Sequence, residues 1–95
     1  MKIIFSKHAD MKIRERKIRI ENIEKTLQEP DFIFYDIHTR SLINVAKIKI
    51  ENVFTNLVVV YTKQENTIKI ITVYPCKDIE REIKKKEMKR WVKIK

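Results

Sequence analysis

The chain has 95 residues, with 22 Lys or Arg against 13 Asp or Glu, and its formal net charge is +9. This length is that of a single domain, and no apolar run approaches the roughly 20 residues of a membrane-spanning helix. The chain has no Gly and one Cys, which argues against a glycine-rich phosphate loop, a disulfide framework and a cysteine-based zinc site. We therefore expect a soluble, cytoplasmic domain whose site lies on its surface.

Apolar spacing predicts a strand, two helices and a second strand in the first part of the chain. Ser6 is a favourable N-cap for the first helix, and Pro30 ends the second. The predicted ranges, in chain order, are Lys2–Phe5, Ser6–Lys17, Ile20–Gln28 and Asp31–Ile37.

Three further strands and a last helix follow, over Ser41–Ile50, Leu57–Tyr61, Thr67–Tyr74 and Asp78–Lys89. Alternation places Ile43, Val45, Lys47 and Lys49 on one face of the first of these strands. The same period of two places Ile68, Ile70, Thr72 and Tyr74 together on one face, and Pro75 is expected to stop that strand. Asn52–Asn56 is predicted to be a loop and Gln64–Asn66 a hairpin turn. The segment Trp91–Lys95 either extends the last helix or forms a last strand.

The resulting order is β-α-α-β-β-β-β-α, which is typical of a small single α+β domain over residues 1–95. Short turns between consecutive strands predict a mostly antiparallel sheet, with the helices packed on one face. Because there is no Gly, tight turns are expected to use Asn or Asp. Residues 76–95 are interpreted as a basic C-terminal helix or tail of the same domain.

Positive charge is concentrated at the two ends of the chain. Residues 76–95 contain nine basic and four acidic side chains, whereas residues 30–75 contain five and four. Basic segments of this kind favour a polyanion partner, most often a nucleic acid. The alternative is a Lys-rich surface that only keeps the domain soluble.

Three short motifs carry a family resemblance. The chain opens with F-S-K-H-A at Phe5–Ala9, continues with R-E-R-K-I at Arg14–Ile18, and reaches I-I-T-V-Y at Ile70–Tyr74. It resembles a DUF family that opens with an F-S-x-H-A box and closes with a T-V-Y box. That family is similar in layout to BrnT-type toxins and to the wider RelE, or barnase–EndoU–colicin–RelE, ribonuclease group. The Gly that usually follows the R-x-R box is Lys17 here.

The resemblance implies an RNA-binding protein similar to the metal-independent endoribonucleases of toxin–antitoxin systems, with RNA and a small antitoxin protein as partners. Such cleavage needs a base for the 2′-hydroxyl, an acid for the leaving oxygen and cations for the phosphoryl charge. The implied catalytic residues are His8, Arg40, Thr72 and Tyr74. Lys47, Lys49, Arg14 and Arg16 are the expected RNA-binding residues.

Each of these residues also has a structural interpretation. His8 is equally well an exposed helix residue, and Arg40 a surface ion pair. Lys47 and Lys49 could equally well be charges that protect an edge strand. Thr72 and Tyr74 could equally well cap the hydrophobic core. His8 and His38 have no carboxylate at ligand spacing, so no metal and no cofactor are expected.

Two other functions remain open from the sequence. One is a non-catalytic RNA-binding module on the same fold. The other is a structural interaction domain whose basic C-terminal helix binds an acidic protein.

Overall fold

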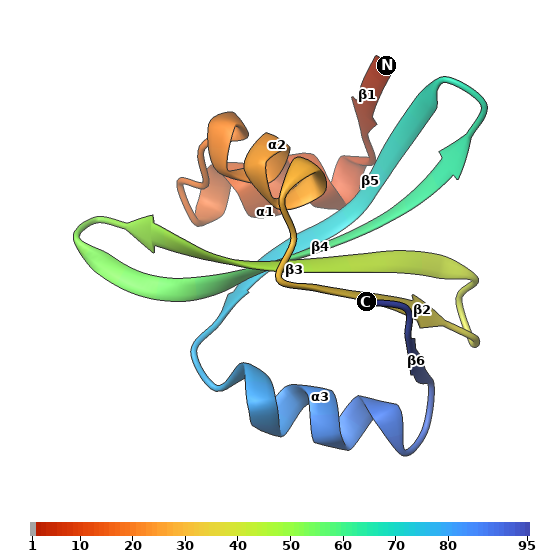
Figure 1. The fold of residues 1–95 in the computed structure, drawn as a ribbon. Helices are drawn as coiled ribbons and strands as arrows, with labels where there is room; N and C mark the ends of the chain where they lie inside the picture. The colour runs from red at the N-terminus through yellow and green to blue at the C-terminus, as the bar shows by residue number, and fades with distance from the viewer. Residues whose placement is uncertain (1) are drawn as a thin grey trace.

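The computed structural model describes residues 2–95, which form a six-stranded sheet with helices on both faces (Figure 1). The strand order is β1-β5-β4-β3-β2-β6; β1 is parallel to β5 and every other pair is antiparallel. The elements are β1 (Lys2–Phe5), α1 (Lys7–Glu15), α2 (Ile20–Gln28), β2 (Phe32–Asp36), β3 (Ser41–Ile50), β4 (Val53–Gln64), β5 (Thr67–Cys76), α3 (Ile79–Glu87) and β6 (Trp91–Lys93).

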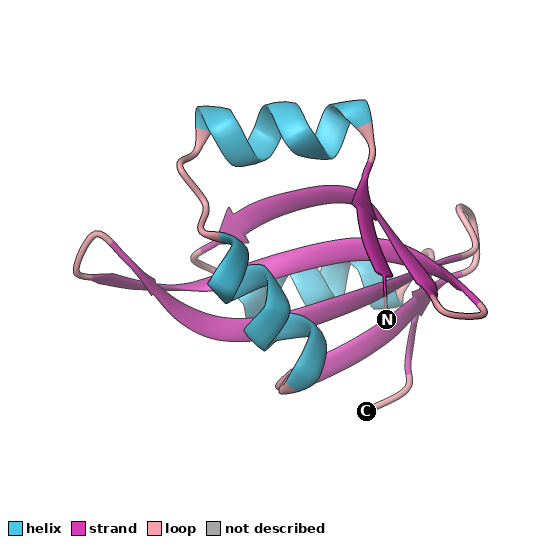
Figure 2. Cartoon of the chain, turned by 90° about the horizontal axis from the view of Figure 1, so that it is seen from above, coloured by secondary structure: helices cyan, strands magenta, loops and turns pink. Residues whose placement is uncertain are grey.

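The α+β class and the mostly antiparallel sheet are confirmed. Helices α1 and α2 pack on one face over a core that includes Ile23, Leu57 and Ile70. Helix α3 lies on the opposite face, as Figure 2 shows, where Ile79 joins a second core with Phe34. The expectation that the helices share one face therefore holds for α1 and α2 only, because an apolar helix stripe does not specify which sheet face it covers. Within residues 2–95, no helix is long and apolar enough to cross a bilayer.

A bulge at Ile71 changes which side chains of β5 share a face. The ladder between β4 and β5 shifts register at this point. As a result, Ile68 and Ile70 pack under α1 and α2, whereas Tyr74 packs under α3. The expected single face of Ile68, Ile70, Thr72 and Tyr74 is therefore wrong, since one extra residue inverts the alternation.

The ends of the chain's strands also differ from expectation. Pro75 does not stop β5 but lies within it. Trp91–Lys93 forms β6, which pairs with β2 and settles the alternative left open by the sequence. The predicted loop Asn52–Asn56 is mostly strand, because β4 begins at Val53 and pairs with β3 from that residue onward.

The tight turns use charged residues in the left-handed conformation as well as Asn. Positive φ angles occur at Lys17 (51°), Arg40 (56°), Glu51 (47°), Asn52 (67°) and Glu65 (50°). A residue with a Cβ atom in this conformation costs about 1–2 kcal/mol. Asn52 is the one Asn or Asp among these five residues, and Asn66 also lies in a turn, between β4 and β5. Lys17, which follows the R-x-R box, thus adopts a conformation that Gly would adopt without this cost.

Candidate functional site

The β3–β4 hairpin forms an arm that projects from the sheet at the left of Figure 1. Its turn is Glu51–Asn52. Near the tip, Lys49 pairs with Phe54, and the Lys49 Nζ atom lies 5.7 Å from the centroid of the Phe54 ring. Phe54 is 65% exposed. The arm thus presents a large aromatic ring and a cation to solvent, at a distance suited to a cation–π contact.

The connection between α1 and α2 presents basic side chains around one apolar anchor. Ile18 is buried in the core under α1 and α2, and its N–H donates to the Ile13 carbonyl at 3.0 Å. On either side of it, Arg16, Lys17 and Arg19 are exposed. The buried Ile18 therefore fixes a short segment whose three cations point away from the core.

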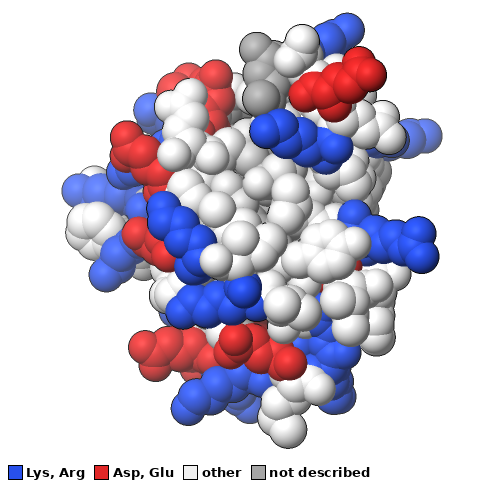
Figure 3. Space-filling view, turned by 45° about the vertical axis from the view of Figure 1, so that its right-hand side comes forward, with Lys and Arg blue, Asp and Glu red and all other residues white. Residues whose placement is uncertain are grey.

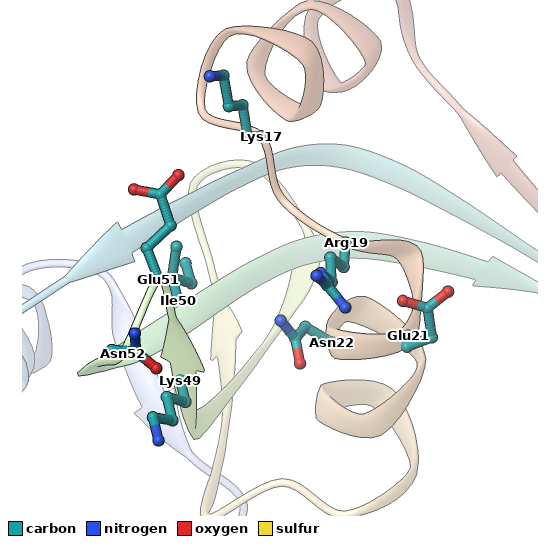
Figure 4. Close-up of a pocket in the computed structure, with 8 residues that line it drawn as sticks. All are labelled: Lys17, Arg19, Glu21, Asn22, Lys49, Ile50, Glu51 and Asn52. Carbon is teal, nitrogen blue, oxygen red and sulfur yellow. The ribbon is translucent and has the colours of Figure 1, made fainter.

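A cavity of about 650 Å³ lies between this connection and the tip of the arm (Figure 4). The connection and the start of α2 contribute one side, and the arm contributes Lys49, Ile50, Glu51 and Asn52. Figure 4 shows Arg19 and Asn22 at the start of α2, across the cavity from the arm. The complete lining is Lys17, Arg19, Glu21, Asn22, Lys49, Ile50, Glu51 and Asn52.

A second cavity, of about 430 Å³, lies next to the first, and Ile50 lines both. Its other lining residues are Arg16, Val53, Thr55, Pro75 and Lys77. We call the two cavities together the hairpin cleft. Five cations and two carboxylates line it.

The cations of the hairpin cleft are free of ion pairs. Within residues 2–95, the salt bridges involve Lys12, Arg14 and Arg90, and none involves a cation that lines the cleft. On the face drawn in Figure 3, by contrast, basic side chains (blue) and acidic side chains (red) are interspersed around an uncharged central area. The cleft therefore combines excess positive charge with a concave surface.

A different cavity, of about 260 Å³, lies under α3, and we call it the α3 cavity. It contains two of the expected catalytic residues, Thr72 and Tyr74, and the cations Lys86 and Arg90. The complete lining is Asp36, Thr39, Ser41, Ile43, Val60, Thr62, Ile71, Thr72, Tyr74, Lys86, Arg90 and Trp91.

The charges of the α3 cavity are largely paired. Oδ2 of Asp36 accepts a hydrogen bond from Nε of Arg90 at 2.8 Å and forms a salt bridge with Nη2 at 2.7 Å. Oδ1 accepts from the backbone N–H groups of His38 and Thr39, at 2.9 and 3.2 Å. Burial alone would raise the pKa of Asp36, but these hydrogen bonds and the Arg90 charge outweigh it and lower the pKa.

Tyr74 is held in its protonated form. Burial is the main cause that raises its pKa, and the nearby Glu82 carboxylate raises it further. The hydroxyl donates to Oε2 of Glu82 at 3.4 Å. Tyr74 can therefore donate a hydrogen bond, but its raised pKa makes it a weak proton donor, and it does not serve as a base at neutral pH.

The structure does not bring the expected catalytic residues into one group. Thr72 and Tyr74 line the α3 cavity. Arg40 is exposed in the β2–β3 turn, next in sequence to two lining residues of that cavity but not itself one of them. His8 is exposed on α1, which packs on the other face of the sheet. His8 and Tyr74 therefore belong to opposite faces of the sheet, because the register shift at Ile71 directs Tyr74 toward α3.

The expected RNA-binding residues also separate. Arg16 and Lys49 line the hairpin cleft. Lys47 is exposed on β3, and its backbone N–H donates to Oδ2 of Asp31 at 2.8 Å. Arg14 pairs with Asp10, its Nε lying 3.2 Å from Oδ2.

Sequence reasoning missed several residues of the cleft. The run R-K-I-R, which continues the R-x-R box, contains Lys17 and Arg19. Basic residues on both sides of a single Ile indicate a short segment with one buried residue and exposed cations. Lys77 and Thr55 gave no signal, since their place beside Arg16 depends on the pairing of β4 with β5. Among the described residues, no group of three or more His, Cys, Asp or Glu side chains is placed to hold a metal ion.

The comparisons with known proteins identify a family for this chain. Residues 5–75 match the family described as Domain of unknown function (DUF4258), and the chain belongs to that family. No curated protein and no solved structure matches the chain. The matched range includes the α1–α2 connection and the β3–β4 arm, and it ends before α3.

Proposed function

We propose that this domain binds RNA, and that the hairpin cleft is its RNA-binding surface. The observation that carries the proposal is the convergence of Arg16, Lys17 and Arg19 with Lys49 and Lys77 around one open cleft. The three segments that supply these cations are far apart in the sequence. Cations without carboxylate partners are available to phosphate groups, and their contacts position a nucleic-acid backbone.

The exposed ring of Phe54 supports single-stranded RNA as the partner. Unstacked bases bind on aromatic side chains, and each such stack contributes about 1–3 kcal/mol. Lys49 lies over the Phe54 ring and also lines the cleft. Phe54 itself points to the opposite face of β4 from Val53 and Thr55, so Lys49 is the residue that would connect a base stacked on the ring with phosphates in the larger cavity.

The test is fluorescence anisotropy with a labelled single-stranded RNA over a range of salt concentrations. A triple variant carries Arg16→Gln, Lys17→Gln and Arg19→Gln. A matched control removes three exposed charges from the region of α3, with Lys84→Gln, Lys85→Gln and Lys89→Gln. We expect the cleft variant to flatten the slope of log affinity against log salt by about 2, since each contact on a single strand contributes about 0.7.

The control variant separates site binding from general attraction. It should keep most of the wild-type slope. An equal loss in both variants would contradict the cleft as the site, and no binding by the wild type at low salt would remove the proposal. A loss confined to the control would favour the basic C-terminal helix as the binding element.

Metal-independent RNA cleavage is the second candidate, and the small antitoxin partner belongs with it. The observation in its favour is that Thr72 and Tyr74 share the α3 cavity with Lys86 and Arg90. Tyr74 has the protonation state of a general acid, and Lys86 would stabilise phosphoryl charge. Asp36 is a poor base, because both its oxygens accept hydrogen bonds and its pKa is lowered.

Cleavage is tested by incubating labelled RNA with the protein in the presence of EDTA. We expect binding without cutting. Cutting that Tyr74→Phe reduces by about 10²-fold or more, while His8→Ala and Arg40→Ala leave it unchanged, would instead establish the second candidate at the α3 cavity. Equal loss in His8→Ala and Arg40→Ala would restore the catalytic group expected from the sequence.

A further inference from the structure

Thr55 stands apart from the other buried polar side chains. Five polar or charged residues are buried within residues 2–95: Thr26, Asp36, Ser41, Asn44 and Thr55. The first four are hydrogen-bonded through their side chains. Oγ1 of Thr55 has no hydrogen-bond partner, although the residue is only 8% exposed. An unpaired buried hydroxyl costs about 1–3 kcal/mol, so this one calls for an explanation.

The position of Thr55 suggests a ligand. It lies on β4 within the arm, paired with Ile48, and it lines the smaller cavity of the hairpin cleft. Arg16 and Lys77 line the same cavity, and no carboxylate does. Oγ1 itself is inaccessible in the rotamer of this structure, so contact with a ligand in the cavity requires a change of about 120° to another staggered rotamer.

We propose that the cavity bounded by Arg16, Thr55 and Lys77 binds a single phosphate group. This inference rests on the proposed RNA binding and names the group that the cleft recognises. A phosphate has several acceptor oxygens, which match a guanidinium, an ammonium and a hydroxyl donor. The apolar walls formed by Ile50, Val53 and Pro75 offer these donors no competing acceptor side chain.

The first test titrates the protein with inorganic phosphate at constant ionic strength, with chloride as the reference anion, and follows the backbone amides by NMR. We expect saturable shifts at Thr55 and Lys77. Thr55→Val keeps the shape of the side chain and should weaken phosphate binding about tenfold, since hydrogen bonds to charged groups are strong. Thr62→Val, on the same strand but lining the α3 cavity, is the matched control and should bind as the wild type does.

A second readout separates this role from a structural one. Without phosphate, Thr55→Val should unfold at a higher temperature than the wild type, because the variant loses the buried unpaired hydroxyl. With phosphate, the wild type should gain stability and the variant should gain much less. A Thr55→Val variant that is less stable without phosphate, or that binds phosphate with wild-type affinity, would overturn the inference.

The source of the phosphate is resolved with two RNAs of one sequence, one with a 5′-phosphate and one with a 5′-hydroxyl. If the site takes a terminal phosphate, Thr55→Val weakens binding of the first RNA only; if it takes a backbone phosphate, binding of both weakens. If Thr55→Val binds both RNAs as the wild type does, the phosphate site is wrong while RNA binding stands. If the wild type binds inorganic phosphate at Thr55 but neither RNA, the site stands and the proposed function is wrong.

Discussion

The α3 cavity and the hairpin cleft both contain cations, but they use them differently. Under α3, Arg90 makes a hydrogen bond and a salt bridge to one oxygen of Asp36, whose other oxygen accepts from the backbone of the β2–β3 turn. In the hairpin cleft, five cations line an open surface and none is in an ion pair within residues 2–95. The comparison teaches that a cation with a buried carboxylate partner maintains the fold, whereas a cation without one is available to a ligand.

Removal of the buried carboxylate should have the largest effect on the free energy of unfolding. Asp36→Asn leaves Arg90 without its charged partner and weakens the cap of the β2–β3 turn. Breaking a buried pair from one side costs about 3–5 kcal/mol, and we expect a loss at the lower end of that range because the Arg90 side chain is 30% exposed and keeps part of its hydration. Urea unfolding at pH 7 measures this loss. A decrease in unfolding free energy below about 1 kcal/mol would show that the Asp36–Arg90 ion pair does not stabilise the region of the α3 cavity.

The same pair predicts how stability depends on pH. The pKa of Asp36 lies below its ordinary value of 3.8 in the folded protein, so the unfolded chain takes up the proton first as pH falls. The stabilisation is therefore complete above about pH 4 and is lost as pH falls through the folded pKa. The difference in unfolding free energy between the wild type and Asp36→Asn should shrink below pH 4. A difference that stays constant down to pH 2 would contradict the lowered pKa.

Substitution of Lys17 tests both the backbone strain and the charge of the hairpin cleft. Its expected effect on the free energy of unfolding is smaller than that of Asp36→Asn. Lys17→Gly should stabilise the fold by up to about 1 kcal/mol, since Gly adopts its positive φ without strain. It should also weaken RNA binding, because a cation is removed from the cleft. Glu65→Gly, at a positive φ in the β4–β5 turn, is the control and should stabilise the fold without weakening RNA binding. Equal RNA affinity in both variants would place Lys17 outside the binding surface.

Much of the fold could be predicted from the sequence, because periodicity and caps are local signals. The alternation of β3, the N-cap at Ser6 and the stop at Pro30 each depend on neighbouring residues only. The bulge could not be predicted, since Ile70 and Ile71 are both apolar and an inserted residue leaves no trace in such a run. The face covered by α3 depends in turn on that bulge and on where Trp91 packs.

The candidate site was predicted only in part. The count of cations and the R-x-R box pointed to Arg16, but the contribution of Lys77 depends on the long pairing of β4 with β5. Phe54 falls within the predicted loop Asn52–Asn56, yet it is an exposed residue of strand β4 in the arm. His8 was singled out through family resemblance, which carries no information on the face of the sheet to which it belongs.

The most direct test of the central claim is NMR mapping of a single-stranded RNA on isotope-labelled protein. The account predicts that amide shifts concentrate in the α1–α2 connection, at the tip of the arm, and at Thr55 and Lys77. Thr72, Tyr74 and Lys86, which line the α3 cavity, should shift little. Shifts concentrated at those three residues, with the hairpin cleft unchanged, would contradict the claim that the unpaired cations are the ones that bind the ligand.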